Sequence, residues 1–262
     1  MNPIDEIALR LDEAAVRAKA VAQFDPDGKM PLSDAYAIQQ AVIARRLARG
    51  ETRAGVKMGF TSRAKMVQMG LSDVIWGRLT DGMRVEEGGS TAFARYIRPR
   101  VEPEIAFVLK KELSGRETAA QALAAVESVA PALEIIDSRY LDFKFSLPEV
   151  IADNASSSGF VIGGWHDPRR EIGNLGLVMS IDGRTVQVGS TSAILGHPLR
   201  SLVAAARLSA AAGERLQPGW IVMAGGATQA EWVQPGQYVS VEMEGLGIAG
   251  FHVADGHAKE AV

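Results

Sequence analysis

Hydrophobic positions divide this chain into a helical beginning and a β-rich remainder. Within the first fifty residues, apolar side chains recur every three or four positions from Ile4 to Ala18 and again from Ser33 to Leu47, which is the spacing of one helix face. The turn-forming segment FDPDGKMP separates the two runs, Ser33 is a suitable cap for the second run, and Gly50 is a suitable end. The pattern therefore predicts two N-terminal helices.

The remaining apolar residues form short runs bounded by glycine, proline and polar turn residues, as β-strands do. We expect strands at residues 54–60, 91–97, 104–109, 132–140, 159–165, 175–182, 185–190, 219–226, 238–244 and 247–253. Helical spacing returns at residues 117–124 and 199–212. Because the strands cluster without regular alternation with helices, we predict an α+β fold, with a helical N-terminal region at residues 1–52 and a mixed-β catalytic domain at residues 53–262.

Charge and composition exclude several classes of protein. The 262 residues carry a formal net charge of −3, from 28 lysines and arginines against 31 aspartates and glutamates, without the basic cluster that nucleic acids or anionic membranes bind. The absence of cysteine excludes disulfides and thiolate metal sites, and it fits a reducing compartment. The sequence begins without the apolar core of a signal peptide, and no apolar run approaches the roughly 20 residues of a membrane span. We therefore expect a cytoplasmic protein.

Four acidic residues on two predicted strands carry the strongest chemical signal. Glu102 and Glu104 are two residues apart in RPRVEPEIAFVL, so a strand places both carboxylates on one face. Glu134 and Asp137 occur in a second apolar segment, PALEIIDSRY. Like charges in a partly apolar setting need a cation or a shared proton, and three or four carboxylates from adjacent strands suit Mg2+ or Mn2+.

The first two acids also have a simpler explanation. If Glu102 and Glu104 faced solvent, they would pair with Arg98, Arg100 or Arg139. Surface acids of this kind are common and need no metal. The spacing alone leaves both explanations open.

A lysine and two small-residue segments extend the candidate site. Lys57 lies inside the apolar strand AGVKMGF, where a buried ammonium needs carboxylates or an anionic ligand, whereas a lysine on an edge strand would reach solvent. The segments DNASSSGF and MAGGAT offer hydroxyls and backbone N–H groups for a carboxylate, and both are also typical of turns. Zinc is disfavoured because the four histidines lack ligand spacing, and His197, which precedes a proline, is typical of a turn or a helix start.

Six segments in order along the chain form one pattern. They are GVKMGFTSRAKMVQMG, RPRVEPEIAFVL, PALEIIDSRY, ADNASSSGFVIGG, LGHPL and MAGGAT. Together they resemble the hydratase/decarboxylase branch of the fumarylacetoacetate hydrolase superfamily, from about residue 35 to residue 250. The resemblance implies a mixed β-roll core preceded by a helical N-terminal region.

The resemblance also implies a set of site residues. Glu102, Glu104 and Glu134 match the ligands of an Mg2+ or Mn2+ ion, with Asp137 as an alternative third ligand or a residue behind the ligands, and Lys57 matches the active-site lysine. The residues expected to line the substrate pocket are Ser156, Ser158, Gly225, Gly226, Thr61 and Met69. The candidates for an apolar wall are Met58, Phe60, Met69 and Leu71.

The implied activity is metal-dependent decarboxylation of 2-oxo-3-hexenedioate (4-oxalocrotonate), a small dicarboxylate 2-oxo acid, to 2-hydroxypenta-2,4-dienoate and CO2 in the meta-cleavage degradation of aromatic compounds. Lys57 would hold the developing enolate or the C1 carboxylate, or would act as a proton shuttle. The resemblance further implies a homo-oligomer that associates with the pathway hydratase. Three alternatives stay open: a 2-hydroxypenta-2,4-dienoate hydratase, a C–C bond hydrolase of an acylpyruvate, and a non-catalytic partner subunit.

Overall fold

The computed structural model describes residues 2–62, 66 and 73–256. In this part of the chain the helices are α1 (Pro3–Val16), α2 (Leu32–Ala48), α4 (Ala119–Ala124), α5 (Leu147–Ala152) and α6 (Pro198–Ala211). None of these helices is long and apolar enough to cross a membrane. The strands are β1 (Arg53–Gly59), β2 (Ile75–Thr80), β3 (Ser90–Ala92), β4 (Arg100–Leu109), β5 (Val126–Ile136), β6 (Ser157–Ile162), β7 (Gly176–Ile181), β8 (Arg184–Ser190), β9 (Ile221–Met223), β10 (Glu231–Trp232), β11 (Tyr238–Met243) and β12 (Gly247–Ala254).

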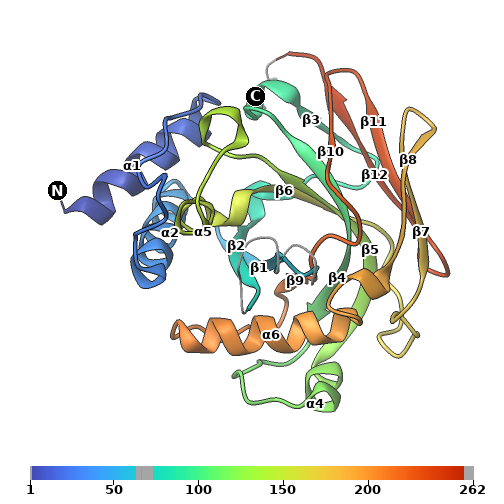
Figure 1. Cartoon of the computed structure of the whole chain (residues 1–262). Helices are drawn as coiled ribbons and strands as arrows, with labels where there is room; N and C mark the ends of the chain where they lie inside the picture. Colours follow the sequence, from blue (N-terminus) through green and yellow to red (C-terminus); the bar gives the residue numbers. More distant parts are fainter. Residues whose placement is uncertain (1, 63–65, 67–72, 257–262) are drawn as a thin grey trace.

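The strands form two sheets. A seven-stranded sheet has the order β2-β1-β9-β4-β5-β6, with β10 paired to β4, and a five-stranded sheet has the order β3-β12-β11-β7-β8. Most pairs are antiparallel, but β1 with β9 and β12 with β3 are parallel, so the sheets are mixed. Figure 1 shows the five-stranded sheet on one side of the molecule and α1, α2 and α5 on the other. The seven-stranded sheet lies between them.

The seven-stranded sheet curls until its two edges meet. After β2 the chain reaches Arg84, which bridges Phe160 of β6, and the Val85 N–H donates to the Phe160 carbonyl at 2.9 Å. Because β2 and β6 are the outer strands of the sheet order, this contact turns the sheet into a roll. One face of each strand therefore looks into an enclosed interior, and strands that are not neighbours in the sheet face each other across it.

A buried polar network fixes the helical layer to the roll. The Gln39 side chain of α2 is fully buried and donates to the carbonyls of Trp76 and Ile151 at 3.1 and 2.8 Å. Its oxygen accepts from Arg78 Nη1 at 2.6 Å, and Arg78 also pairs with Glu214. Every member has a partner, which is what buried polar groups require. The network ties α2 to β2 and α5, two elements that border the interior.

Several predicted boundaries need correction, and among them the strands predicted at residues 132–140 and 219–226 end earlier, at Ile136 and Met223. The strand predicted at residues 91–97 stops at Ala92, because a short 3-10 helix, Phe93–Arg95, follows it. Ser33 does not cap the second helix, because it already lies within the first turn of α2, where its hydroxyl donates to Asp34. In the last two places a local backbone turn overrides the residue preference.

Two elements that border the interior do not follow from the apolar pattern. β2 lies in a segment to which we assigned no element, and so does α5. For α5 a signal exists, since Ser146 and Glu149 form a capping box just before a short apolar run. The division of the chain after residue 52 stays a prediction, and β1 begins at Arg53.

Glu149 provides a test of how the N-terminal segment is held. Its buried carboxylate accepts from the backbone N–H groups of Phe24 and Asp25 and from the Gln23 amide, at 2.6 to 2.9 Å. We expect Glu149→Ala to lower the free energy of unfolding by about 2 kcal/mol, because it removes the acceptor of three partly buried donors and leaves a cavity in place of a buried side chain. Urea denaturation measures this, with the exposed Glu87→Ala as the control, expected within about 0.5 kcal/mol of the parent. Equal losses in both variants would contradict the prediction.

Candidate metal centre and active site

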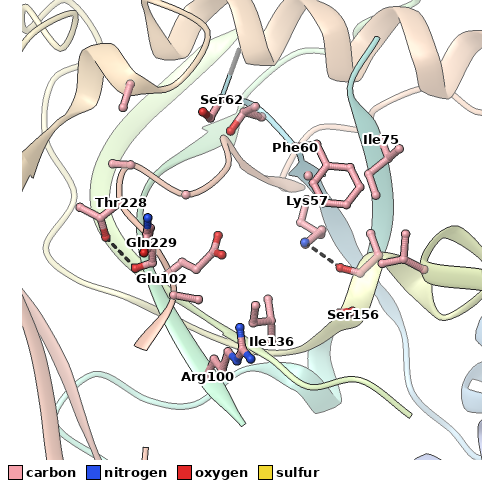
Figure 2. A pocket seen from close by; sticks show the side chains of 18 of the residues that line it. Lys57, Phe60, Ser62, Ile75, Arg100, Glu102, Ile136, Ser156, Thr228 and Gln229 are labelled. Carbon is pink, nitrogen blue, oxygen red and sulfur yellow. Dashed lines mark hydrogen bonds between the residues drawn. The ribbon is translucent and has the colours of Figure 1, made fainter. Parts of the chain in front are cut away.

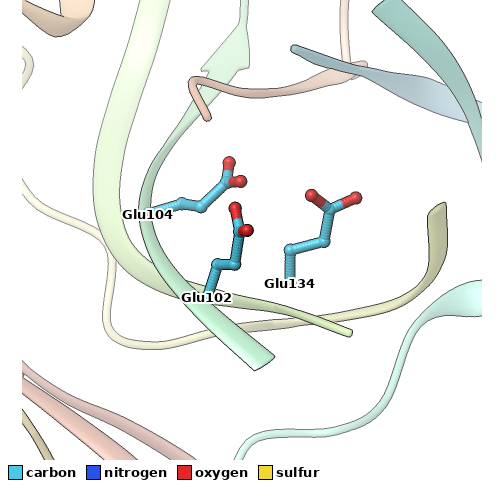
Figure 3. A group of neighbouring side chains, drawn as sticks. All are labelled: Glu102, Glu104 and Glu134. Atoms are coloured by element: carbon cyan, nitrogen blue, oxygen red, sulfur yellow. The ribbon is translucent and has the colours of Figure 1, made fainter. Parts of the chain in front are cut away.

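Three glutamates meet inside the roll. Glu102 and Glu104 alternate onto one face of β4, and Glu134 of β5 lies directly opposite Glu102 in the strand register. In Figure 3 the three side chains point toward one another, and one oxygen from each lies within 4.8 Å of the others. Glu104 and Glu134 are fully buried, and Glu102 is 9% exposed. This burial excludes the explanation that the acids face solvent.

Lys57 faces this cluster from another strand of the roll. It lies on β1, which is an interior strand between β2 and β9, so it does not reach solvent from a sheet edge. Its Nζ atom is 3.0 Å from Glu134 Oε2 and donates to the Ala155 carbonyl at 3.0 Å. The structure thus places the predicted active-site lysine against the predicted metal ligands.

Burial and the neighbouring charges shift the pKa values of Glu104, Glu134 and Lys57. Burial raises the pKa of Glu104 well above its usual range, the neighbouring Glu134 charge raises it further, and Lys57 partly offsets both effects. Burial also raises the pKa of Glu134, which Lys57 counteracts. For Lys57, burial alone would lower the pKa, but the three carboxylates outweigh it and raise the pKa. The lysine is therefore an ammonium.

The carboxylate oxygens fit a hard divalent cation. Glu104 Oε1 and Glu134 Oε1 are buried and accept no hydrogen bond from any residue that the structure describes. One ammonium cannot compensate two fully buried carboxylates, so the cluster needs a further cation or proton. All the donors are oxygens, which favours Mg2+ or Mn2+ over softer metals. Glu102, Glu104 and Glu134 are the residues that would hold it.

A glycine pair brings backbone against the cluster. The Gly225 N–H donates to Glu104 Oε2 at 2.7 Å, and Gly225 has a positive φ of 103°. A Cβ atom on Gly225 would lie 2.2 Å from Thr61 Oγ1, and one on Gly226 would lie 2.2 Å from Glu102 Oε2. A side chain at either position would clash with Thr61 or Glu102, so both positions of this turn require glycine. The structure brings Gly225, Gly226 and Thr61 together, and of these Gly226 and Thr61 line the cavity described below.

Ser156 reaches the interior through an unusual backbone path. Asn154, Ala155 and Ser156 all have positive φ angles, of 52°, 52° and 59°. The Asn154 side chain secures this path, because its oxygen accepts from the Arg78 N–H at 2.7 Å and its amide donates to the Arg78 carbonyl at 2.9 Å. The Ala155 carbonyl consequently faces Lys57, and the buried Ser156 hydroxyl has no hydrogen-bond partner within the described ranges.

Ser158 and Asp137 lie in a separate hollow of about 250 Å³. The Ser158 hydroxyl accepts from Arg139 Nη1 at 2.6 Å, and Asp137 accepts from the backbone N–H groups of Ile97 and Arg98 at 2.8 and 2.7 Å. Asp137 is three residues after Glu134, so the alternation of a strand would place it on the opposite face, and β5 in any case ends at Ile136. The left-handed path before β6 likewise separates Ser158 from Ser156. The structure does not bring these two residues to the metal cluster.

The cluster opens onto a cavity of about 690 Å³ (Figure 2). Phe60, Ile75 and Val150 give it an apolar wall, while Thr61 and Ser156 add hydroxyls. Met58, which we expected in the wall, is buried in the core instead, because it alternates with Lys57 along β1. Met69 and Leu71 lie outside the described residues.

Several cavity residues were not predicted. Arg100 appeared in the sequence only as an ion-pair partner for acids, yet it lines the cavity. The two-residue spacing that joins Glu102 to Glu104 also joins Arg100 to Glu102, so this signal was present. Phe143 comes from a single-turn 3-10 helix, Leu141–Phe143, and Gln229 comes from a loop, and neither is long enough to give a periodic signal.

Residues 62–254 match the family described as fumarylacetoacetate (FAA) hydrolase, C-terminal. This chain belongs to the fumarylacetoacetate hydrolase family. A 4-oxalocrotonate decarboxylase from a Pseudomonas species is 58% identical to it over 248 residues, which cover 95% of this chain and 97% of the relative. A 2-hydroxyhexa-2,4-dienoate hydratase from Comamonas testosteroni is 36% identical, over 91% of this chain and 92% of the relative.

A solved structure extends this family relationship to the fold. The 4-oxalocrotonate decarboxylase from Pseudomonas putida G7, complexed with magnesium and adipate, matches with a TM-score of 0.92 and 37% identity, over 95% of this chain and 97% of that chain. The fold predicted for this family member, a mixed β-roll with a helical N-terminal region, is confirmed.

Substitutions in this family member decide whether Glu134 or Asp137 is the third metal ligand. We expect Glu104→Gln and Glu134→Gln each to weaken Mn2+ or Mg2+ binding by about 100-fold or more, since each removes a charged oxygen donor. Asp137→Asn should change the affinity by less than about 3-fold, because its partners are backbone N–H groups outside the cluster. Calorimetric titration of the metal-free protein measures all three. A large loss in Asp137→Asn with none in Glu134→Gln would reverse the assignment.

Proposed function

We propose that this chain catalyses the metal-dependent decarboxylation of 2-oxo-3-hexenedioate (4-oxalocrotonate) to 2-hydroxypenta-2,4-dienoate and CO2, in the meta-cleavage degradation of aromatic compounds. The observation that carries the proposal is the oxygen-only cluster of Glu102, Glu104 and Glu134 beside Lys57, which opens onto a cavity at Glu102 and Lys57. The 58% identity to a 4-oxalocrotonate decarboxylase supports the reaction. The relative with bound magnesium and adipate, a six-carbon diacid, supports the metal and the substrate class.

The substrate is a vinylogous β-keto acid, which determines where charge develops. The C5–C6 bond breaks, its electron pair forms the C4–C5 double bond, the C3–C4 pair moves to C2–C3, and the carbonyl pair moves to the C2 oxygen. Carbon dioxide leaves, and the dienolate takes up one proton to give the product. When bound, Mg2+ or Mn2+ supplies positive charge where the C2 oxygen and the C1 carboxylate gather negative charge.

Residues of the chain bind the substrate oxygens and limit the access of water. Lys57, kept as an ammonium by the nearby carboxylates, holds the dienolate oxygen or the C1 carboxylate, and a proton-shuttle role is the competing assignment. The partnerless Ser156 hydroxyl is a further donor for substrate oxygens. Phe60, Ile75 and Val150 limit the water around the reacting atoms.

The alternatives have less support. The hydratase relative is more distant than the decarboxylase, at 36% against 58% identity. A hydrolase would need a histidine to activate water, but none of the three described histidines lines the cavity: His166 bonds the Leu246 carbonyl, His197 caps α6 and His252 contacts the Tyr238 ring. The intact carboxylate cluster and lysine disfavour a non-catalytic subunit.

We also propose the assembly and location that the family suggests: a homo-oligomer in the cytoplasm, associated with the hydratase that uses its product. Val188, Val178, Glu242 and Ile248 follow one another across four strands of the five-stranded sheet. The three apolar members are 70%, 36% and 53% exposed, and this row supports contact with another subunit. The absence of cysteine fits a reducing compartment.

Metal removal tests the proposed reaction. After EDTA treatment we expect no CO2 release from 2-oxo-3-hexenedioate. We expect added Mg2+ or Mn2+ to restore it, because the metal stabilises the negative charge that develops on the C2 oxygen. Product identification accompanies the assay. Full activity of the metal-free protein, or hydration of 2-hydroxypenta-2,4-dienoate to 4-hydroxy-2-oxopentanoate as the main reaction, would contradict the proposal.

Lys57→Ala separates metal binding from turnover. Loss of the ammonium should lower kcat by about 100-fold or more, because charge on the C2 oxygen loses a donor. Metal affinity should not fall, since the lysine repels the cation and supplies no ligand. Steady-state kinetics and metal titration on the same preparation measure both. Normal kinetics would show that the lysine is only structural.

A further inference from the structure

The cavity has a second cation, which the proposed mechanism leaves without a role. Of the described residues that line it, only Lys57 and Arg100 carry positive charge. The charges of Glu102 and Glu231 attract Arg100 from a distance, but no carboxylate within residues 2–62 and 73–256 is in ion-pair contact with it, and its buried Nε atom has no hydrogen-bond partner there. A guanidinium at a cavity wall with no carboxylate in direct contact can bind an anion.

Aromatic rings hold this guanidinium in place. Its central carbon lies 3.6 Å from the centroid of Trp232 and 4.4 Å from that of Phe143. The two rings meet edge to face at 89°, with centroids 5.7 Å apart. Because the two rings are perpendicular, at most one of them can lie parallel to the guanidinium plane, so together they fix its position and leave N–H groups for a planar, two-oxygen partner. Figure 2 shows Arg100 beside Ile136 at the border of the cavity.

Strand β4 sets the distance between Arg100 and the metal cluster. Arg100, Glu102 and Glu104 alternate onto one face, and their β5 partners are Ile136, Glu134 and Ala132. With a rise of about 3.3 Å per residue, Arg100 stands about 7 Å further along the strand than Glu102. In the proposed substrate the C6 carboxylate is four bonds from C2, or about 5 Å in an extended chain. A diacid whose C1 and C2 oxygens lie at the glutamates therefore extends its far carboxylate toward Arg100.

We propose that Arg100 binds the distal carboxylate of the substrate and selects dicarboxylate 2-oxo acids over monocarboxylate ones. This inference rests on the proposed function for the identity of the diacid. A monoacid would leave the guanidinium without its partner, which penalises binding. The contact belongs to the ground state, because breaking C5–C6 turns this carboxylate into neutral CO2 while the charge moves to the C2 oxygen. Arg100 therefore contributes to KM more than to kcat.

The test compares Arg100→Gln with Arg98→Gln in the Mg2+-loaded enzyme. Arg98 is exposed and stacks on the same Trp232 ring at 5.2 Å, but it does not line the cavity, so it is a matched control. We expect Arg100→Gln to raise KM for 2-oxo-3-hexenedioate by roughly 10- to 100-fold and to change kcat by less than about 3-fold. Arg98→Gln should stay within about 2-fold of the parent in both constants.

Direct binding supplies a second measurement that does not need turnover. Calorimetry with 2-oxoadipate and 2-oxohexanoate compares a diacid with a monoacid of the same chain length. The parent should prefer the diacid, and Arg100→Gln should lose that preference by weakening 2-oxoadipate alone, by roughly 10- to 100-fold. If Arg100→Gln fails to fold, Arg100→Lys decides, since it keeps the charge but loses the planar fork and should retain only part of the preference.

The outcomes separate the two proposals. A diacid preference that is absent in the parent, or unchanged in both Arg100 variants, overturns the role of Arg100 even if CO2 is released. A parent enzyme that releases no CO2 but loses diacid binding in Arg100→Gln overturns the proposed reaction and supports the role of Arg100.

Discussion

The buried carboxylates of Glu104 and Glu134, held around one lysine, are the constraint on which the rest of the structure depends. Two fully buried negative charges beside a single ammonium are tolerated only where hydrogen bonds and a further cation or proton compensate them. The Gly225 N–H and the close backbone turn at Gly226 serve this need. Two buried carboxylates of this kind favour the binding of a cation between them.

The curled sheet is what makes the cluster possible. β1 and β5 are separated by two strands in the sheet order, yet Lys57 lies 3.0 Å from Glu134, because the sheet closes on itself where Arg84 bridges Phe160. The helical layer braces the same closure through the buried Gln39 network. One face of β4 then carries the buried Glu104, Glu102 and the partly exposed Arg100 in that order. An extended diacid can therefore place one end at the glutamates and the other at the arginine.

Residue spacing along the chain predicts the positions of side chains where one strand or one pair of neighbouring strands decides the geometry. The spacing of Glu102 and Glu104 sufficed to place both carboxylates together, and the N-terminal helices and α6 followed from apolar periodicity. Residue spacing predicts less where the backbone leaves regular helix or strand geometry. Three successive left-handed residues end at Ser156, so Ser156 and Ser158 do not share a face although they are two residues apart.

The sequence by itself determined the chemistry of this protein: oxygen donors without thiolates, an ordered set of motifs, and acids at strand spacing. Only the tertiary structure decided which groups meet across the roll, since β1, β4 and β5 are distant in the chain and their facing depends on closure of the whole sheet. The same holds for Arg100, whose aromatic platform joins Phe143 and Trp232 from two separate segments. Local patterns record which residues share a face, but contacts between faces arise from the free energy of packing the entire chain.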